Sequence, residues 1–222
     1  MGPAGCGKST VAAQYAFSAA QRGETAVMFC FDESPETLLF RCKAMGMNLY
    51  PFVENRSILI QQIDPAELSP GEFVCRVREH VERKNAPVVI IDSLNGFLNA
   101  MPDEQYLTLQ LHELLSYLGQ QGAVAILTMA QHGFMGNSME SPVDVSYLAD
   151  SVVLFRYFEF EGHIKQAISV VKKRTGLHER TIRELEFNRD GMRVGPALNE
   201  FQGILTGVPR FTGTALDLER EP

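Results

Sequence analysis

The residues best suited to chemistry stand at the start of the chain, in the run Met-Gly-Pro-Ala-Gly-Cys-Gly-Lys-Ser-Thr. The pattern G-x-x-x-x-G-K-[ST], typical of a phosphate-binding P-loop, is filled by Gly2, Gly7, Lys8 and Ser9. Glycines let the backbone curl so that successive N–H groups point at a phosphate. Lys8 adds a mobile positive charge, and the Ser9 hydroxyl is an oxygen ligand that suits Mg²⁺. The spacing predicts a nucleotide-phosphate site; the alternative is a glycine-rich turn that happens to contain a lysine.

A carboxylate follows a buried strand later in the chain. Asp92 comes directly after the apolar run 88–91, which predicts a strand buried on both faces. Open α/β sheets bind ligands at the carboxyl ends of such strands. Asp92 therefore occupies the Walker-B position, where a carboxylate holds Mg²⁺ directly or through water, with Ser93 placed to assist by hydrogen bonding. The alternative is an ordinary solvated aspartate at a strand end.

Two adjacent carboxylates, Asp32 and Glu33, follow an earlier apolar run, 25–31. Parallel strands end on one rim of a sheet, so we expect this pair on the rim that carries the P-loop. A carboxylate there can orient and deprotonate the attacking water or hydroxyl. The alternative is a polar turn or the charged start of a helix. Gln131, beyond a fourth apolar run, is either a sensor of the γ-phosphate or a plain loop residue.

The chain around these residues alternates between strand-like and helix-like segments. Helices are predicted over 8–22, 35–45, 70–84 and 102–121, and strands over 25–31, 57–63, 87–91 and 123–128. Ser34 with Pro35, and Ser69 with Glu72, are typical helix starts. Units of these lengths predict an α/β fold with a mostly parallel central sheet flanked by helices.

In the second half of the chain, the predicted strands follow one another without helices between them. Residues 132–142 are loop-like, and closely spaced strands are predicted over 151–157, 165–174 and 181–187. This spacing favours C-terminal antiparallel hairpins added to the edge of the parallel sheet. A P-loop normally follows a buried strand, and since only Met1 precedes Gly2, the strand before the P-loop is predicted to be missing. We expect one domain over 1–206 and a polar, flexible tail over 207–222.

Composition narrows the class of protein. The chain has 222 residues, 45% of them hydrophobic, and a formal net charge of −7. Its length supports one sizeable core, and its acidic balance argues against a nucleic-acid partner. Neither a signal peptide nor an apolar run of transmembrane length is visible, so we expect a cytoplasmic protein with no membrane partner. Reduced thiols are expected for the four cysteines, which form no C-x-x-C pair: Cys6, Cys30, Cys42 and Cys75.

Several motifs, in their order along the chain, resemble those of KaiC-type ATPases of the RecA superfamily. They are the P-loop, FDES (31–34), MGM (45–47), VVIIDSL (88–94), FMG (134–136), DVSYLADSVVL (144–154), AISVVKKRTGLHER (167–180) and FQGILTGVP (201–209). The similarity covers nearly the whole chain and looks closest to the second of the two KaiC ATPase domains. It implies a RecA-like P-loop NTPase core that binds ATP and Mg²⁺. It also implies a ring-shaped homo-oligomer, a hexamer, with ATP bound between neighbouring subunits.

The resemblance implies roles within one subunit. The phosphates would be held by Ala4, Gly5, Cys6, Gly7, Lys8, Ser9 and Thr10. Asp32 and Glu33 match a catalytic pair of glutamates, and Lys8 completes the catalytic set. Ser9, Asp32 and Asp92 would hold Mg²⁺. Met45 matches an aromatic residue that lies against adenine, where a flexible thioether gives weaker stacking.

Other roles concern the neighbouring subunit and phosphorylation. Lys172, Arg174 and His178 match the loop that reaches the neighbour's ATP. Ser146 falls on an autophosphorylated serine, and Ser141 falls on a threonine implicated in phosphotransfer. Tyr147 replaces a phosphorylated threonine. The resemblance further implies regulatory protein partners.

These inferences lead to a Mg²⁺-dependent ATPase of the KaiC type that also autophosphorylates on Ser146 and acts in circadian-clock-like or signalling regulation. Two alternatives remain open. One is a RecA-like ATPase of DNA recombination or repair, against which the acidic balance and the lack of basic loops weigh. The other is a truncated subunit that uses ATP only for assembly.

Overall fold

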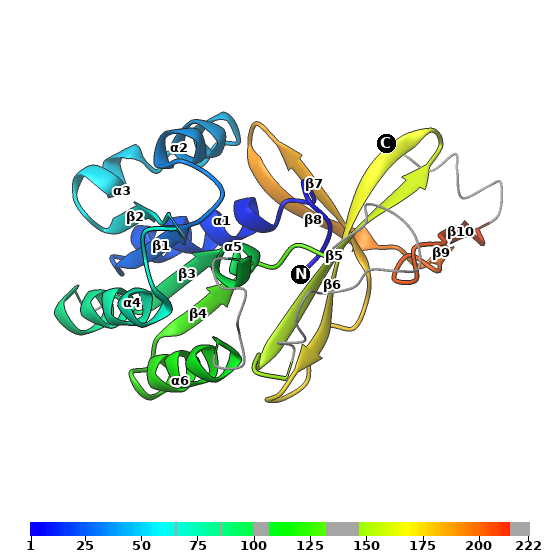
Figure 1. The fold of residues 1–222 in the computed structure, drawn as a ribbon. Helices are drawn as coiled ribbons and strands as arrows, with labels where there is room; N and C mark the ends of the chain where they lie inside the picture. Colours follow the sequence, from blue (N-terminus) through cyan, green and yellow to red (C-terminus); the bar gives the residue numbers. More distant parts are fainter. Residues whose placement is uncertain (65, 85, 100–106, 132–146, 214–222) are drawn as a thin grey trace. The chain divides into compact units, whose positions relative to one another are not determined.

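The computed structural model describes residues 1–64, 66–84, 86–99, 107–131 and 147–213, which belong to two compact units (Figure 1). The first, which we call the parallel unit, consists of the described residues of Gly7–Ala130 and Arg189–Gly191. The second, the antiparallel unit, consists of the described residues of Met1–Cys6, Gln131–Asn188 and Met192–Pro222. Each unit has its own apolar core.

The parallel unit alternates helices and strands, as the sequence predicts. Its helices are α1 (Lys8–Gln21), α2 (Pro35–Ala44), α3 (Tyr50–Glu54), α4 (Pro70–Lys84), α5 (Leu94–Asn99) and α6 (Leu107–Gln120). None of these described helices is long and apolar enough to cross a membrane. Its strands are β1 (Ala26–Cys30), β2 (Ile58–Gln62), β3 (Val88–Asp92) and β4 (Val124–Leu127). They pair in parallel in the order β2-β1-β3-β4, which confirms the predicted α/β fold and is consistent with a RecA-like core.

The register of this sheet brings three strand ends level. Cys30 pairs with Asp92, and Ile91 pairs with Leu127. The backbone N–H of Thr128 extends the alignment past β4 by donating to the Ile91 carbonyl at 3.0 Å. Residues that follow β1, β3 and β4 therefore meet on one rim of the sheet, where the sequence places the candidate carboxylates.

Side chains of the sheet alternate between two apolar layers. Met28 of β1 and Ile90 of β3 pack with the buried face of α1, which is made of Ala12, Ala13, Ala16, Ala19 and Ala20. Phe29 faces the other way, because successive side chains of a strand point to opposite faces. Its ring lies 5.2 Å, centroid to centroid, from that of Phe73 in α4. The core thus fixes α1, whose first turn belongs to the P-loop motif, against β1 and β3.

The predicted starts of α2 and α4 are confirmed. Ser34 caps α2, since its Oγ accepts from the Thr37 N–H at 3.3 Å. Ser69 and Glu72 form a capping box at α4: Ser69 Oγ accepts from the Glu72 N–H at 3.3 Å, and Glu72 Oε2 accepts from the Ser69 N–H at 2.9 Å. The cap of α2 matters for the site, because α2 begins directly after Asp32 and Glu33.

The described residues of the antiparallel unit form strands and no helix. The strands are β5 (Ser151–Phe160), β6 (His163–Lys173), β7 (Arg183–Asn188), β8 (Gly191–Ala197), β9 (Phe201–Gln202) and β10 (Arg210–Phe211); Gly191, the first residue of β8, is grouped with the parallel unit. β5 to β8 form one sheet in that order, and β9 pairs with β10. The sequence predicted hairpins on the edge of the parallel sheet, whereas these strands hydrogen-bond to one another in sheets of their own. The long β5–β6 hairpin is paired from Ser151–Lys173 to Phe160–His163. On the other edge of β5, the Phe155 N–H donates to the Met1 carbonyl and the Met1 amino group donates to the Val153 carbonyl, both at 2.8 Å.

Aromatic rings build the core of the antiparallel unit. Phe158 is buried and lies 5.3 Å from Phe201, measured between ring centroids. Phe211 of β10, in the segment predicted to be a tail, lies 5.3 Å from the same ring. The domain boundary at 206 stays a prediction.

The elements that the sequence analysis did not predict are short or contain helix and strand breakers. α3 has five residues and carries Pro51, and α5 has six and carries Gly96. β8 contains Pro196 and lies at the edge of its sheet, the position to which prolines in sheets are mostly confined.

Candidate active site

The P-loop glycines adopt backbone conformations that suit a phosphate loop. Gly5 has a φ of 76° and Gly7 a φ of 94°, in the left-handed region that residues with a side chain disfavour. α1 begins at Lys8, and Gly7 at its N-cap supplies no side-chain cap. Backbone N–H groups of a first helical turn have no partner within the helix, so they are suited to bind an anion. The start of α1 therefore fits a phosphate.

Ser9 and Asp92 meet on the rim of the sheet. Ser9 Oγ donates to Asp92 Oδ1 at 3.0 Å. Thr128, the residue after β4, donates its hydroxyl to the same carboxylate oxygen. Asp92 is 8% exposed and Thr128 is 4% exposed. Hydroxyl donors from two elements thus offset the cost of burying the carboxylate and hold it facing the P-loop serine.

The two carboxylates after β1 have different partners. Asp32 is exposed, and its Oδ2 accepts from Ser93 Oγ at 2.7 Å. Glu33 is half-buried, and both of its oxygens are engaged by Arg41: Nε donates to Oε1 at 3.1 Å and Nη2 to Oε2 at 2.7 Å. The remaining guanidinium nitrogen, Nη1, donates to Thr10 Oγ1 at 2.7 Å. The sequence analysis predicts that these two carboxylates act as one pair. In the structure they have different hydrogen-bond partners, Ser93 for Asp32 and Arg41 for Glu33.

The charges of the rim act on their neighbours. Hydrogen bonding to Glu33 raises the pKa of Arg41 above its ordinary value. Burial, reinforced by the negative charges of Asp92 and Glu33, raises the pKa of the Cys30 thiol to about 12. A thiol with so high a pKa stays neutral at physiological pH, so Cys30 acts in packing rather than as a nucleophile.

The oxygen atoms on the rim fit Mg²⁺. Mg²⁺ takes six oxygen ligands at about 2.1 Å in octahedral geometry, so neighbouring ligand atoms lie about 3.0 Å apart. The Ser9 and Asp92 oxygens already stand 3.0 Å apart. Within the described ranges, no group of three or more His, Cys, Asp and Glu side chains is arranged to hold a metal ion. Mg²⁺ binds proteins through one or two carboxylates and completes its shell with water and phosphate oxygens.

The first residues of the P-loop pack within the antiparallel unit. Ala4 and Gly5 are exposed, whereas Cys6 is fully buried. The Tyr157 hydroxyl of β5 donates to the Ala4 carbonyl at 3.2 Å. Burial raises the pKa of Tyr157, so this hydroxyl keeps the proton that it donates. The conformation of the exposed part of the loop is therefore supported by a side chain of β5.

The basic residues assigned to a neighbouring subunit lie at the end of β6 and in the segment that follows it. Lys172 and His178 are half-buried. Arg174 follows the strand and forms an ion pair with Asp150 at 3.0 Å, in which the side chains are 56% and 74% exposed. The role of these three residues toward a second subunit stays a prediction.

The remaining assigned residues are dispersed. Met45 is the C-cap of α2 and packs, partly buried, against the core of the parallel unit. Gln131 Oε1 accepts from Arg156 Nη1 at 2.7 Å, so this glutamine already has a partner within its own unit. Ser141 and Ser146 lie outside the described residues. The assignments of Met45 to adenine and of Ser146 to phosphorylation stay predictions.

Two residues of the rim are absent from the sequence prediction. Thr128 ends a predicted strand. Because open α/β sheets bind ligands at the carboxyl ends of their strands, the argument that selected Asp92 applies to Thr128 as well. Arg41 lies in α2 beside the buried Leu38 and Cys42, a pattern that puts position 41 near the inner side of the helix. Its partner Glu33 is eight positions earlier, beyond the reach of helical i, i+4 pairing, so no local pattern joins them.

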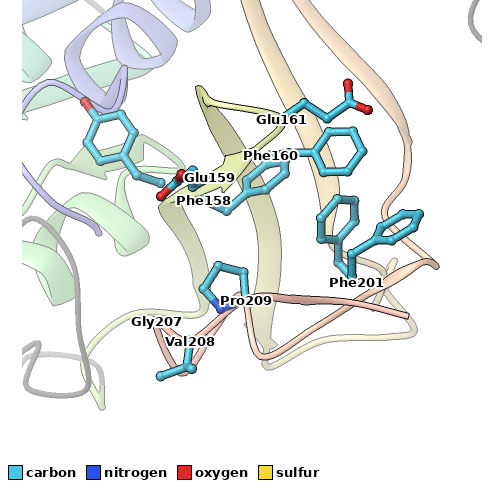
Figure 2. A pocket seen from close by; sticks show the side chains of 10 residues that line it. Phe158, Glu159, Phe160, Glu161, Phe201, Gly207, Val208 and Pro209 are labelled. Carbon is cyan, nitrogen blue, oxygen red and sulfur yellow. The ribbon is translucent and has the colours of Figure 1, made fainter. Parts of the chain in front are cut away.

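Figure 2 shows side chains that line a pocket in the antiparallel unit. The volume of this cavity is about 450 Å³. Phe158, Phe160, Phe201 and Phe211 contribute to its walls. None of the predicted site residues lines it. Tyr157, whose hydroxyl donates to the Ala4 carbonyl, is also among the lining residues.

A parallel α/β sheet, a glycine-rich loop that opens a helix, and a strand-end carboxylate bonded to the serine of that loop define the class of P-loop nucleotide-binding proteins. A family model described as "ATPase: KaiC" matches residues 1–199. The chain belongs to the KaiC ATPase family.

Curated relatives carry the same family name. The chain is 23% identical over 219 residues to "Circadian clock protein KaiC3" of Synechocystis sp., with 99% of this chain and 43% of the relative covered. It is 21% identical over 220 residues to "Circadian clock oscillator protein KaiC" of Acaryochloris marina, with 99% and 42% covered. It is 22% identical over 208 residues to the protein of that name in Synechococcus elongatus, with 94% and 40% covered. The chain thus spans about two fifths of the length of these relatives, and the comparisons favour the KaiC-type interpretation over the DNA-recombination one.

Proposed function

We propose that this domain binds ATP at the P-loop and hydrolyses it to ADP and phosphate in a Mg²⁺-dependent reaction. The observation that carries the proposal is the 3.0 Å hydrogen bond from Ser9 Oγ to Asp92 Oδ1. It joins the P-loop to the carboxylate at the end of β3, and these are the two features with which P-loop NTPases hold Mg²⁺. Membership of the KaiC ATPase family supports the same reaction.

ATP binding is assigned to the segment from Ala4 to Thr10. The backbone N–H groups at the start of α1 and the ammonium group of Lys8 bind the β- and γ-phosphates. Ser9, Asp32 and Asp92 are the residues that would hold Mg²⁺, which supplies neutralising charge for the phosphates when bound. Met45 is assigned to the adenine ring, as a flexible apolar contact.

The reaction is an in-line displacement at the γ-phosphorus. Asp32 or Glu33 orients a water and takes its proton. A bond forms between the water oxygen and the γ-phosphorus, and the bond from that phosphorus to the oxygen of the leaving ADP breaks. Lys8 and the backbone N–H groups stabilise the charge that develops on the phosphoryl oxygens.

Charge stabilisation from a neighbouring subunit is the second part of the mechanism. We assign it to Lys172, Arg174 and His178, in a ring-shaped homo-oligomer with six subunits. In the isolated chain Arg174 pairs with Asp150, and both side chains are mostly exposed. Such surface pairs are worth about 0–1 kcal/mol, so a phosphate can replace the aspartate at little cost.

Autophosphorylation of Ser146 is proposed as a second activity. The serine hydroxyl takes the place of water, so its oxygen bonds to the γ-phosphorus, ADP leaves, and the proton passes to Asp32 or Glu33. The support is the position of Ser146 in the motif DVSYLADS. Because relatives are named as circadian clock proteins, we place the domain in clock-like or signalling regulation, in the cytoplasm, with regulatory protein partners.

Phosphate release from ATP by the purified chain tests the ATPase. Release should require Mg²⁺ and stop when EDTA is added, and turnover that is unchanged by EDTA would reject the Mg²⁺-dependent mechanism. Incubation with ATP and Mg²⁺ followed by mass spectrometry tests the autokinase. Phosphate on Ser146 supports it, whereas phosphate elsewhere or nowhere rejects it and leaves a plain ATPase.

A further inference from the structure

Arg41 joins three elements of the parallel unit through one side chain. From α2, its Nε and Nη2 donate to the two carboxylate oxygens of Glu33, after β1, at 3.1 and 2.7 Å. Its Nη1 donates to Thr10 Oγ1, in the first turn of α1, at 2.7 Å. Glu33 is adjacent to Asp32, and Thr10 is adjacent to Ser9. One guanidinium therefore links the neighbours of two residues assigned to the reaction.

The surroundings of Arg41 make this link stronger than a surface ion pair. The Arg41 and Glu33 side chains are 28% and 23% exposed, and Thr10 is 6% exposed. Arg22 and Glu24, by contrast, are paired at 60% and 42% exposure. A bidentate guanidinium–carboxylate pair is shorter and roughly twice as strong as a neutral hydrogen bond, and its planar geometry holds the carboxylate in one orientation.

The backbone that carries Arg41 is itself fixed. Ser34 caps α2 and Pro35 occupies its first position. Leu38 and Cys42 are fully buried on either side of Arg41 in the sequence. The guanidinium therefore starts from a helix that cannot rotate without exposing apolar side chains, and its hydrogen bonds transmit that rigidity to Glu33 and Thr10.

We propose that Arg41 is a positioning residue for the ATPase reaction, which holds the Glu33 carboxylate in one orientation and couples it to the phosphate-binding end of α1. This inference rests on the proposed function. Arg41 acts through Glu33 and Thr10 and makes no contact with the reacting atoms. Its loss lets the carboxylate pair after β1 move relative to the P-loop, so turnover suffers more than ATP binding.

Steady-state hydrolysis by Arg41→Gln tests the proposal. Misplacing a catalytic group by about 1 Å costs on the order of a hundredfold in rate, so kcat should fall about ten- to hundredfold. KM for ATP should change less than about threefold, because the interaction acts mainly in the transition state. Arg41→Lys keeps the positive charge but loses the bidentate guanidinium donors, so the kcat of this variant should stay well below that of the wild type. Arg22→Gln, which removes an exposed pair, is the matched control and should keep wild-type kcat; wild-type kcat in both Arg41 variants would overturn the proposal.

A double-mutant cycle separates positioning from a general loss of stability. If Arg41 acts through Glu33, adding Arg41→Gln to Glu33→Gln should change kcat by less than about twofold. An equal loss in both backgrounds would show that Arg41 acts elsewhere and would overturn the proposal. If Arg41→Gln fails to fold, Arg41→Lys takes its place in the cycle.

The Nε–H proton of Arg41 reports the link without any turnover. In the nucleotide-free protein its NMR signal should exchange slowly, vanish in Arg41→Lys and lose its protection in Glu33→Gln. A wild-type chain without ATPase activity would reject the proposed function, and this signal would still test the Arg41–Glu33 link. A rapidly exchanging Nε–H in an active wild-type protein would overturn the proposal about Arg41 alone.

Discussion

The Ser9 hydroxyl donates to the Asp92 carboxylate at 3.0 Å, although 83 positions separate the two residues in the chain. The contact arises because α1 packs on β1 and β3, and because Asp92 ends the strand that lies beside β1. It unites the hydroxyl and the carboxylate that a P-loop site needs for Mg²⁺.

Ser9→Ala and Asp92→Asn should therefore weaken the use of Mg²⁺. Loss of groups that hold or orient a metal typically costs roughly ten- to hundredfold in metal affinity. The Mg²⁺ concentration for half-maximal ATP hydrolysis should rise by that factor in both variants. Ser18→Ala removes a hydroxyl that accepts from Gln14 in the same helix, and it should leave the Mg²⁺ requirement unchanged. An unaltered requirement in both site variants would show that this pair does not hold the ion.

Asp32→Asn and Glu33→Gln should slow turnover more than they weaken ATP binding. A group that orients or deprotonates water acts in the transition state and contributes roughly a hundred- to ten-thousandfold to the rate. Single-turnover hydrolysis and equilibrium ATP binding, measured on each variant, separate the two effects. Glu36→Gln, an exposed change in the first turn of α2, is the control. Near wild-type turnover in both site variants would reduce the pair to a polar strand end.

Subunits with complementary defects should restore activity when mixed. Lys8→Ala disables a subunit's own P-loop. Lys172→Ala with Arg174→Ala removes the cations that the subunit supplies to the ATP of its neighbour. The Lys8→Ala parent should be inactive because it lacks the P-loop cation. The Lys172→Ala/Arg174→Ala parent should lose about three to five powers of ten in kcat, the usual worth of residues supplied in trans to a phosphoryl group. Lys173 neighbours Lys172 on β6 and points to the other face, so Lys173→Ala should do much less. A mixture that co-assembles and stays inactive would contradict the in-trans role.

The stability of the parallel unit should fall above pH 9 through Cys42. Burial raises the pKa of this thiol from 9.0 to about 11. Between these values the unfolded chain has released a proton that the folded chain keeps, so the free energy of unfolding decreases as pH rises. The loss is at most about 1.4 kcal/mol per pH unit. Urea unfolding at pH 8 and pH 10 should show a steeper decrease for the wild type than for Cys42→Ala, and equal decreases would contradict the assignment.

Local patterns were sufficient to predict most of the parallel unit. Apolar runs with turn residues at their ends predicted β1 to β4, and Ser34 and Ser69 marked the helix starts that the structure confirms. The meeting of Ser9 with Asp92 followed from topology, because parallel strands with helical crossovers end on the same rim.

Features that depend on distant partners could not be predicted in this way. Arg41 contacts Glu33 and Thr10 only in the folded chain, and the spacing of these residues in the sequence does not predict the contacts. The separate antiparallel sheet depends on which strands pair, and strand spacing alone does not specify the partner. Short elements such as α3 and α5 owe their shape to packing rather than to intrinsic propensity.

ATP hydrolysis by wild-type and Lys8→Ala chains, compared in the same Mg²⁺-containing buffer, tests the central claim most directly. Lys8 is the charged group that the P-loop offers to the β- and γ-phosphates, so the account predicts that Lys8→Ala abolishes hydrolysis and weakens ATP binding. Arg83→Ala removes an exposed cation of α4 in the same unit and should leave hydrolysis unchanged. Full hydrolysis by a folded Lys8→Ala protein would contradict the assignment of this loop as the ATP site.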